Sequence, residues 1–383
     1  MTTESTPLHL PPLSLYIHIP WCMRKCPYCD FNSHTTDSIP EKNYVEALIA
    51  DLDQELESVQ GRQLHSIFFG GGTPSLFSAK AINTILSEVE KRIPFSSQIE
   101  ITLEVNPSTV EQQKFSGYYS AGVNRLSIGV QSFNPHQLKS LGRTHNNVEA
   151  INAVQTAKTA GFHNVNIDLM HGLPEQSQVD ALQDIQQAVD LDASHISWYQ
   201  LTIEPNTVFY TSPPTLPVDD LLADIQQAGE QMLAKNNFKQ YEISAFCQPN
   251  RQSKHNLNYW LFGDYIGIGA GAHGKITSLS NQTIQRRWKT RAPKDYLSTD
   301  NNILAGNKEI SQEDLPLEFM MNSLRLNAGF QKELFSQRTG LSFSMAEEKI
   351  HTLIDRKLLA EHSSTIKPTP IGRKFLNNIL AEF

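Results

Sequence analysis

The chain has 383 residues and four cysteines, three of which lie in the stretch 21–31, WCMRKCPYCDF: Cys22, Cys26 and Cys29. Three thiolates on one loop can hold three corners of a [4Fe–4S] cube and leave the fourth iron without a protein ligand. A tetrahedral zinc site would need a fourth ligand, which His18 or His34 beside the loop could supply. Reduced structural thiols are a third reading. We expect the cluster, because four cysteines are too few for a disulfide scaffold and three of them share one loop. The remote Cys247 is expected to be an ordinary buried cysteine.

Outward from this loop, short apolar runs typical of strands alternate with helical patterns. The predicted strands are residues 14–19, 65–70, 98–106, 125–130, 164–170 and 195–203. The predicted helices are residues 43–59, 78–93, 110–121, 148–160 and 179–191. This α/β alternation predicts a parallel sheet covered by helices, either open or curled into a partial barrel.

Polar and glycine-rich segments follow the predicted strands and do not precede them. The cysteine loop follows the first strand, and GGGTPS at residues 70–75 follows the second. Glu104, Gln131 and Asp168 close later strands or follow them. Carboxyl ends of parallel strands gather functional groups at one edge, so we expect one site there. The glycines would let the backbone approach a ligand closely, and Thr73 would add a hydroxyl.

We divide the chain into a tail at 1–13, a barrel at 14–205, a barrel-completing segment at 206–308 and a small C-terminal domain at 309–383. That domain is expected to be mainly helical, with helices at 315–326, 331–339 and 345–359, followed by a wing and a last helix. A winged helix suggests DNA binding. However, residues 311–383 carry nine basic and nine acidic side chains, which gives no electrostatic footprint for phosphates. We therefore expect a packing or gating role.

The whole chain has a net charge of −8, so we expect no nucleic-acid partner. No apolar run reaches the length of about 18 residues that a bilayer span requires, and the first residues lack a basic region followed by an apolar one. These features favour a protein of the reducing cytoplasm.

The cysteine loop after a first strand, followed by GGGTP after a second, resembles the radical S-adenosylmethionine (SAM) superfamily. The resemblance implies a partial (β/α)6 barrel. It also implies a [4Fe–4S] cluster on Cys22, Cys26 and Cys29, with SAM bound at the open iron. An electron donor such as a flavodoxin or a ferredoxin is implied if radical chemistry occurs.

Within that superfamily, the segments PWCMRKCPYCDFNS, FFGGGTPS, LEVNP, RLSIGVQSF, LGRTH and NIDLMHGLP resemble the oxygen-independent coproporphyrinogen III oxidase group. The resemblance implies that nine residues surround SAM: Tyr16, Tyr28, Gly71, Gly72, Thr73, Glu104, Gln131, Arg143 and Asp168. Oxidative decarboxylation of a porphyrinogen is therefore an alternative function, and a radical methylase or cyclopropanase is a weaker one.

Two departures from the oxidase pattern weigh against decarboxylation. The oxidase pattern has a fourth cysteine where this chain has Phe31, and only 21 residues precede Cys22. The short form resembles instead the HemW group of haem chaperones. We therefore do not expect oxidase activity. We expect a protein that carries haem and hands it to apo-haemoproteins, which the resemblance places among membrane respiratory enzymes. Transient association with the membrane would follow.

The motif HNLNYW at residues 255–260 accompanies the HemW group, and the resemblance implies that His255, Tyr259 and Trp260 contact haem. A neutral imidazole is a natural ligand of haem iron, and aromatic side chains can stack on the macrocycle. His273 at the end of GIGAGAHG is a rival ligand. The basic segment QRRWKTRAPK at residues 285–294 could face the haem propionates or form a solvated surface.

Overall fold

Six parallel strands form the centre of the computed structural model, which describes residues 7–298 and 302–383. Across the sheet they are β1 (Leu13–Ile19), β4 (Leu64–Gly71), β5 (Phe95–Val105), β6 (Arg125–Gln131), β7 (Val165–His171) and β8 (His195–Gln200). Almost every residue of β1, β6 and β7 is buried. Such continuous burial is typical of parallel strands whose two faces are both covered.

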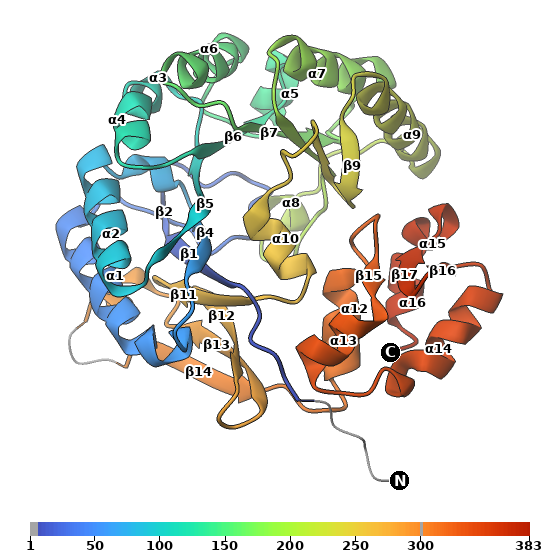
Figure 1. The fold of residues 1–383 in the computed structure, drawn as a ribbon. Coiled ribbons are helices and arrows are strands. Elements are labelled where there is room, and N and C mark those ends of the chain that lie inside the picture. The colour runs from blue at the N-terminus through green and yellow to red at the C-terminus, as the bar shows by residue number, and fades with distance from the viewer. Residues whose placement is uncertain (1–6, 299–301) are drawn as a thin grey trace.

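Helices cover the outer face of this sheet (Figure 1). The longer ones are α1 (Glu41–Glu55), α2 (Ala79–Arg92), α6 (Asn147–Thr159), α7 (Gln178–Asp190) and α9 (Asp219–Lys235). Shorter helices are also present: η1 (Leu56–Val59), η2 (Pro74–Leu76), α5 (Pro135–Ser140), α8 (Val208–Thr211), α10 (Lys254–Trp260) and α11 (Pro293–Tyr296). Of these, α10 packs on the inner face of the sheet, where His255 contacts Ser66 and Phe68 of β4. The predicted α/β alternation is confirmed.

One predicted helix is wrong. Residues 110–121 form two short helices, α3 (Thr109–Gln112) and α4 (Phe115–Ser120). The buried Glu111 carboxylate turns inward, where the Ser75 hydroxyl and the Asn106 amide donate to it. The Lys114 ammonium donates to the carbonyl oxygens of Ser75 and Leu76. The chain is therefore bent to support the η2 turn after β4. The last predicted parallel strand is also shorter than expected, because β8 ends at Gln200 and not at residue 203.

Strands from the second half of the chain extend both edges of the sheet. At the β8 edge, β10 (Ala245–Cys247) and β9 (Lys239–Glu242) pair antiparallel. At the β1 edge, β11 (Asp264–Ile268) pairs parallel to β1 and is followed by the antiparallel strands β12 (His273–Ser278), β13 (Thr283–Lys289) and β14 (Leu304–Glu309). Within the described residues, β9 and β14 are the outer strands of a twelve-stranded sheet, so the barrel is open.

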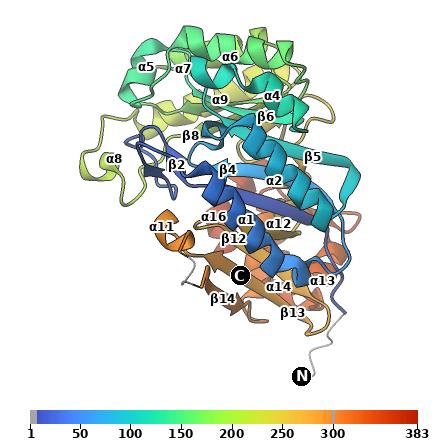
Figure 2. The same ribbon diagram turned by 90° about the vertical axis from the view of Figure 1, so that its left-hand side faces the viewer.

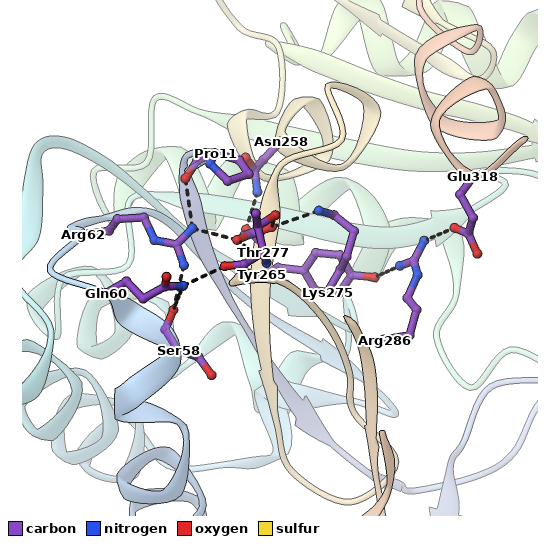
Figure 3. Close-up of polar contacts among 11 residues, drawn as sticks. Pro11, Ser58, Gln60, Arg62, Asn258, Tyr265, Lys275, Thr277, Arg286 and Glu318 are labelled. Atoms are coloured by element: carbon purple, nitrogen blue, oxygen red, sulfur yellow. Dashed lines mark hydrogen bonds and ion pairs between the residues drawn. The ribbon is translucent and has the colours of Figure 1, made fainter. Parts of the chain in front are cut away.

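Buried ion pairs fasten this extension to the barrel. The Asp264 carboxylate accepts from the Arg62 guanidinium at 2.8 Å and from the Lys275 ammonium at 2.9 Å. Figure 3 shows Arg62 and Lys275 reaching the same place from opposite sides. Farther along the extension, the Lys289 ammonium lies 2.6 Å from Asp51 and 2.7 Å from Glu55, both on α1.

A small C-terminal unit follows β14 and lies beside the extension (Figure 1). It contains α12 (Leu315–Ser323), β15 (Phe330–Gln331), α13 (Lys332–Thr339), α14 (Ser344–Asp355), β16 (Leu359–His362), β17 (Thr365–Pro368), α15 (Pro370–Lys374) and α16 (Leu376–Leu380). The β16–β17 hairpin is the predicted wing. Helix α14 ends earlier than predicted, because Lys357 adopts a left-handed φ of 60° and the Leu358 amide caps the Leu353 carbonyl.

The segment predicted as an N-terminal tail also contacts the C-terminal unit. Residues 1–6 lie outside the described residues, but Leu8 is buried in the core of that unit. The His9 amide donates to the Gln337 carbonyl at 3.1 Å. No helix among the described residues is both long enough and apolar enough to cross a membrane.

Candidate cofactor and ligand cavities

A cavity of about 320 Å³ lies at the carboxyl ends of the parallel strands, and we call it the cluster cavity. Of the twelve residues that the sequence predicts to hold the cluster or SAM, eleven line it: Cys22, Cys26, Tyr28, Cys29, Gly71, Gly72, Thr73, Glu104, Gln131, Arg143 and Asp168. The twelfth, Tyr16, lines the neighbouring cavity described below. The structure therefore brings together residues that are spread over 150 positions of sequence.

The cysteine loop is held at this rim by a short parallel pair, β2 (Trp21–Cys22) with β3 (His34–Thr35). Figure 2 shows β2 on the same side of the molecule as α8. Helix α8 supports the loop directly, because the Phe209 amide donates to the Pro27 carbonyl at 3.0 Å and its ring lies 6.4 Å from that of Tyr28.

Each cysteine sulfur has a polar neighbour. The Thr73 hydroxyl donates to Cys22 Sγ at 3.3 Å, the Arg143 guanidinium donates to Cys26 Sγ at 3.7 Å, and Cys29 Sγ lies 3.9 Å from the Ser33 hydroxyl. Burial raises the pKa of the Cys22 and Cys29 thiols. A bound metal would therefore have to displace the protons of these thiols, because cysteine ligates metals as the thiolate.

The donor set fits a cluster with one open iron. Three half-buried thiols face one cavity that also exposes polar groups suited to an amino acid and a ribose. The Arg143 Nε atom in its wall is buried without a hydrogen-bond partner among the described residues. A bound anionic group or thiolate would satisfy it.

The glycine turn after β4 is shaped by packing against the cysteine loop. Gly71 has a φ of 118°, and a Cβ there would lie 2.6 Å from the His18 ring. A Cβ on Gly72 would lie 2.5 Å from the Trp21 carbonyl oxygen. The close approach that requires glycine is therefore to β1 and β2. That these glycines also let a ligand approach the backbone stays a prediction, and both line the cluster cavity.

Two acidic residues, Glu104 and Asp168, line the cluster cavity. Asp168 accepts from the Ser127 hydroxyl at 2.9 Å and from the Asn166 amide at 2.8 Å. Glu104 is deeply placed, and burial together with the nearby Asp168 raises its pKa to about 8. Glu104 is thus protonated near neutral pH until a cation enters, and a ligand ammonium or sulfonium would restore its charge.

A second cavity of about 960 Å³ adjoins the first and shares Phe31, Gly71 and Glu104 with it. We call it the aromatic cavity. It lies between β1, the β11–β13 extension and α12 of the C-terminal unit. Its principal side chains are Tyr16, His18, Phe31, Tyr259, Trp260, Phe262, Tyr265, His273, Lys275, Arg286, Trp288, Arg291 and Asn322. Several of these residues or their segments were singled out from the sequence, but Phe262, Tyr265, Lys275 and Asn322 were not.

The HNLNYW motif forms α10, at one wall of the aromatic cavity. Tyr259 and Trp260 line the cavity, but His255 does not. His255 is 1% exposed, its Nδ1 lies 2.9 Å from the Ser66 hydroxyl, and its Nε2 lies 2.8 Å from the Tyr259 hydroxyl. Burial lowers its pKa to about 3. In this structure His255 is a packed, neutral histidine that positions Tyr259.

The basic segment at residues 285–294 is not one solvated surface. Arg287 and Lys289 face α1, where they pair with Glu55 at 2.8 and 2.7 Å. Arg286 and Arg291 instead line the aromatic cavity. Figure 3 shows the Arg286 guanidinium between Tyr265 and Glu318, to which it donates at 2.7 and 2.5 Å. Alternation along β13 sends neighbouring side chains to opposite faces, which composition alone does not reveal.

Comparison with known proteins places these cavities in a family. The radical SAM superfamily model matches residues 16–188, and the HemN C-terminal domain model matches residues 310–375. The chain is 51% identical to the haem chaperone HemW of Haemophilus influenzae and 48% identical to that of Escherichia coli, in each case over 98% of both chains.

The chain belongs to the HemW family. The match to the HemW of Bacillus subtilis, at 32% identity over 97% of this chain and 98% of the relative, agrees with this assignment. This chain shares its fold with one solved oxidase. The solved structure of the radical SAM enzyme coproporphyrinogen III oxidase, HemN, of Escherichia coli superposes with a TM-score of 0.81 over 97% of this chain and 90% of its own, at 22% identity. Radical SAM membership implies a [4Fe–4S] cluster and SAM.

Proposed function

We propose that this protein is a haem chaperone, which holds haem in the aromatic cavity and passes it to apo-haemoproteins. HemW relatives that span the whole chain carry that description. The observation that carries the proposal here is the aromatic cavity itself, which combines an apolar wall, imidazoles and cations beside the cluster cavity.

The chemistry of this cavity matches the three parts of a haem. Trp260, Trp288 and Tyr259 offer flat surfaces for the macrocycle. Arginine guanidinium groups suit the propionate carboxylates. Histidine suits the iron. The volume of about 960 Å³ is at the upper end of the range usual for ligand pockets, as a large planar cargo requires.

Phe31 argues against porphyrinogen decarboxylation as the function. Its side chain is 64% exposed and lies in the wall that the two cavities share. By resemblance, the oxidases have a fourth cysteine at this position. An apolar ring in place of a thiol favours contact with a bound macrocycle over the oxidase chemistry. The likeness to the oxidase structure, at 22% identity, bears on the fold alone.

In this proposal Cys22, Cys26 and Cys29 hold the cluster. The glycine turn and the carboxylates of Glu104 and Asp168 would hold SAM. When bound, the two cofactors supply one-electron cleavage of a carbon–sulfur bond. The Arg143 guanidinium, which donates to the Cys26 sulfur, would offset the charge of the thiolate. Tyr16 lines the aromatic cavity and would face the bound haem.

The partners follow from this role. The acceptors would be apo-haemoproteins, including respiratory enzymes at the membrane. A flavodoxin or ferredoxin would supply electrons if the cofactors react.

Two assays on one cluster-loaded preparation test the function. Ferric haem added to the protein is expected to give a stoichiometric shift of the Soret band, and mixing with an apo-haemoprotein should transfer that haem. Incubation with coproporphyrinogen III and SAM without oxygen is expected to give no protoporphyrinogen. Absence of stoichiometric haem binding would overturn the proposal, and turnover of the porphyrinogen would establish the alternative.

A further inference from the structure

The aromatic cavity is lined by two imidazoles within the described part of the chain, His18 and His273. His18 is 5% exposed, and both of its nitrogens have partners: Nδ1 lies 3.0 Å from the Tyr16 hydroxyl and Nε2 lies 2.9 Å from the Asn32 carbonyl. His255 has both nitrogens engaged as well and does not face the cavity. Neither histidine can reach an iron atom without breaking these contacts.

His273 differs from both. It is the first residue of β12, its side chain is exposed, and neither ring nitrogen has a hydrogen-bond partner among the residues that the structure describes. Desolvation and the neighbouring arginines lower its pKa, which keeps the imidazole in the neutral form that binds iron.

The surroundings of His273 hold its ring in place. Its cross-strand partner is Trp288 on β13, and the two rings stack with centroids 6.5 Å apart and planes 24° apart. Trp288 in turn lies over Gly306, where a Cβ would come within 2.0 Å of the indole. Strand β14 therefore supports Trp288, and Trp288 supports the imidazole.

The cations around His273 are not equivalent. The Lys275 ammonium is directed to Asp264, and Arg286 is paired with Glu318. Arg291 also lines the cavity and is exposed, and its guanidinium has no partner among the described residues. It is the cation at this wall that is free to meet a carboxylate.

We propose that His273 is the side chain that ligates the iron of bound haem, and that Arg291 receives one of its propionates. This inference rests on the proposed haem-binding function and names the ligands within that site. The iron–nitrogen bond forms without any net redox change, and it requires only a neutral imidazole.

The test compares His273→Ala, His255→Ala and the wild-type protein, each titrated with ferric protoporphyrin IX and examined by absorption and electron paramagnetic resonance. We expect His273→Ala to lower haem affinity about tenfold or more and to change the spin state of the iron. Exogenous imidazole should restore the wild-type spectrum in His273→Gly. Thermal unfolding of the haem-free His273 variants should match that of the wild type, because the side chain is exposed.

The outcomes separate the two proposals. If the wild-type protein binds no haem, the proposed function fails. If His273→Ala binds haem with an unchanged spectrum, His273 is not the ligand although the function stands. If His255→Ala alone loses the spectrum while its circular dichroism remains native, the ligand is His255 and the inference is overturned.

A separate binding experiment tests the role of Arg291. Arg291→Gln should weaken binding of ferric protoporphyrin IX but not of its dimethyl ester, which has no carboxylates. An equal loss with both compounds would remove Arg291 from the proposal.

Discussion

At the scale of single residues, Cys26 gives the most direct test of the cluster. Its sulfur lies 3.7 Å from the Arg143 guanidinium in the cluster cavity. Cys26→Ala leaves two thiols on the loop, which are too few to hold a cube, and we expect loss of bound iron and labile sulfide after anaerobic reconstitution. Cys247→Ala is the matched control, because Cys247 is buried on β10 and does not line that cavity. Equal iron in both variants would refute the assignment.

Glu104 predicts a pH dependence of stability. Burial raises its pKa from 4.5 to about 8, so between these values the folded protein keeps a proton that the unfolded chain has lost. The stabilising effect of that proton is complete below pH 4.5 and is lost as the pH rises through 8. The unfolding free energy of the cofactor-free wild type should therefore fall, relative to that of Glu104→Gln, across this window. Chemical denaturation of both proteins at several pH values measures the difference. A constant difference would contradict the pKa shift.

The contacts of single residues also explain which functional residues could be predicted from the sequence. The residues predicted to hold the cluster and SAM lie in local motifs at strand ends, so a motif and a strand prediction suffice to place them near one another. His255 stands in an equally local motif, yet its role depends on Ser66 and Tyr259, with which it makes hydrogen bonds. The direction in which Arg287 points depends in the same way on α1. Such contacts arise only in the folded chain.

At the scale of elements, the turn after β4 can be tested by adding one carbon atom. Gly71 and Gly61 both have positive φ, but a Cβ on Gly61 meets nothing within 4 Å, whereas one on Gly71 meets His18. Gly61→Ala should cost about 1 kcal/mol of stability through backbone strain alone. Gly71→Ala should cost about 1–3 kcal/mol more, because the tightly held His18 ring must move. It should also weaken SAM binding, which equilibrium dialysis measures beside urea denaturation. If Gly61→Ala and Gly71→Ala lower the free energy of unfolding equally, the His18 ring moves aside without a measurable cost.

The contact between β13 and α1 gives a second test at this scale. Lys289 and Asp51 are 2% and 0% exposed, and Asp51 also accepts from the Gly269 amide and the Tyr296 hydroxyl. Lys289→Met leaves the buried Asp51 carboxylate without its ammonium partner. We expect the free energy of unfolding, measured by chemical denaturation, to fall by about 3–5 kcal/mol. The double variant Lys289→Met with Asp51→Asn should recover part of that loss. If the double variant recovers none of the stability, the loss comes from the missing Lys289 ammonium and not from the unpaired Asp51 carboxylate.

At the scale of the whole molecule, the six-stranded parallel centre follows from alternating patterns, but the twelve-stranded sheet does not. β11 returns to pair with β1 across about 250 residues of sequence. Its five residues, DYIGI, carry no local sign of their partner. The aromatic cavity is built on this long-range pairing. For that reason the sequence indicated single segments of this cavity, such as HNLNYW and residues 285–294, but not Tyr265, Lys275 or Asn322, which the pairing and α12 add to its walls.

Phe262 belongs to the hydrophobic core of the C-terminal unit and also lines the aromatic cavity. This side chain is 1% exposed and stacks edge-on against Phe319 of α12 with ring centroids 5.7 Å apart. It follows α10 in the chain and lines the aromatic cavity, so it connects the C-terminal unit to the wall of the proposed haem site. Phe262→Ala should cost about 3–5 kcal/mol, mostly at this junction.

In Phe262→Ala, calorimetry is expected to show the C-terminal unit unfolding at a lower temperature in a transition of its own, where the wild type unfolds in a single cooperative transition. Haem affinity should fall in the same variant, because Asn322 and the Glu318 partner of Arg286 are both carried by α12. Phe375→Ala is the control, since the same truncation at a side chain that is 51% exposed should leave both measurements near the wild-type values. If Phe262→Ala unfolds in one transition and keeps wild-type haem affinity, the C-terminal unit does not help to form the haem site.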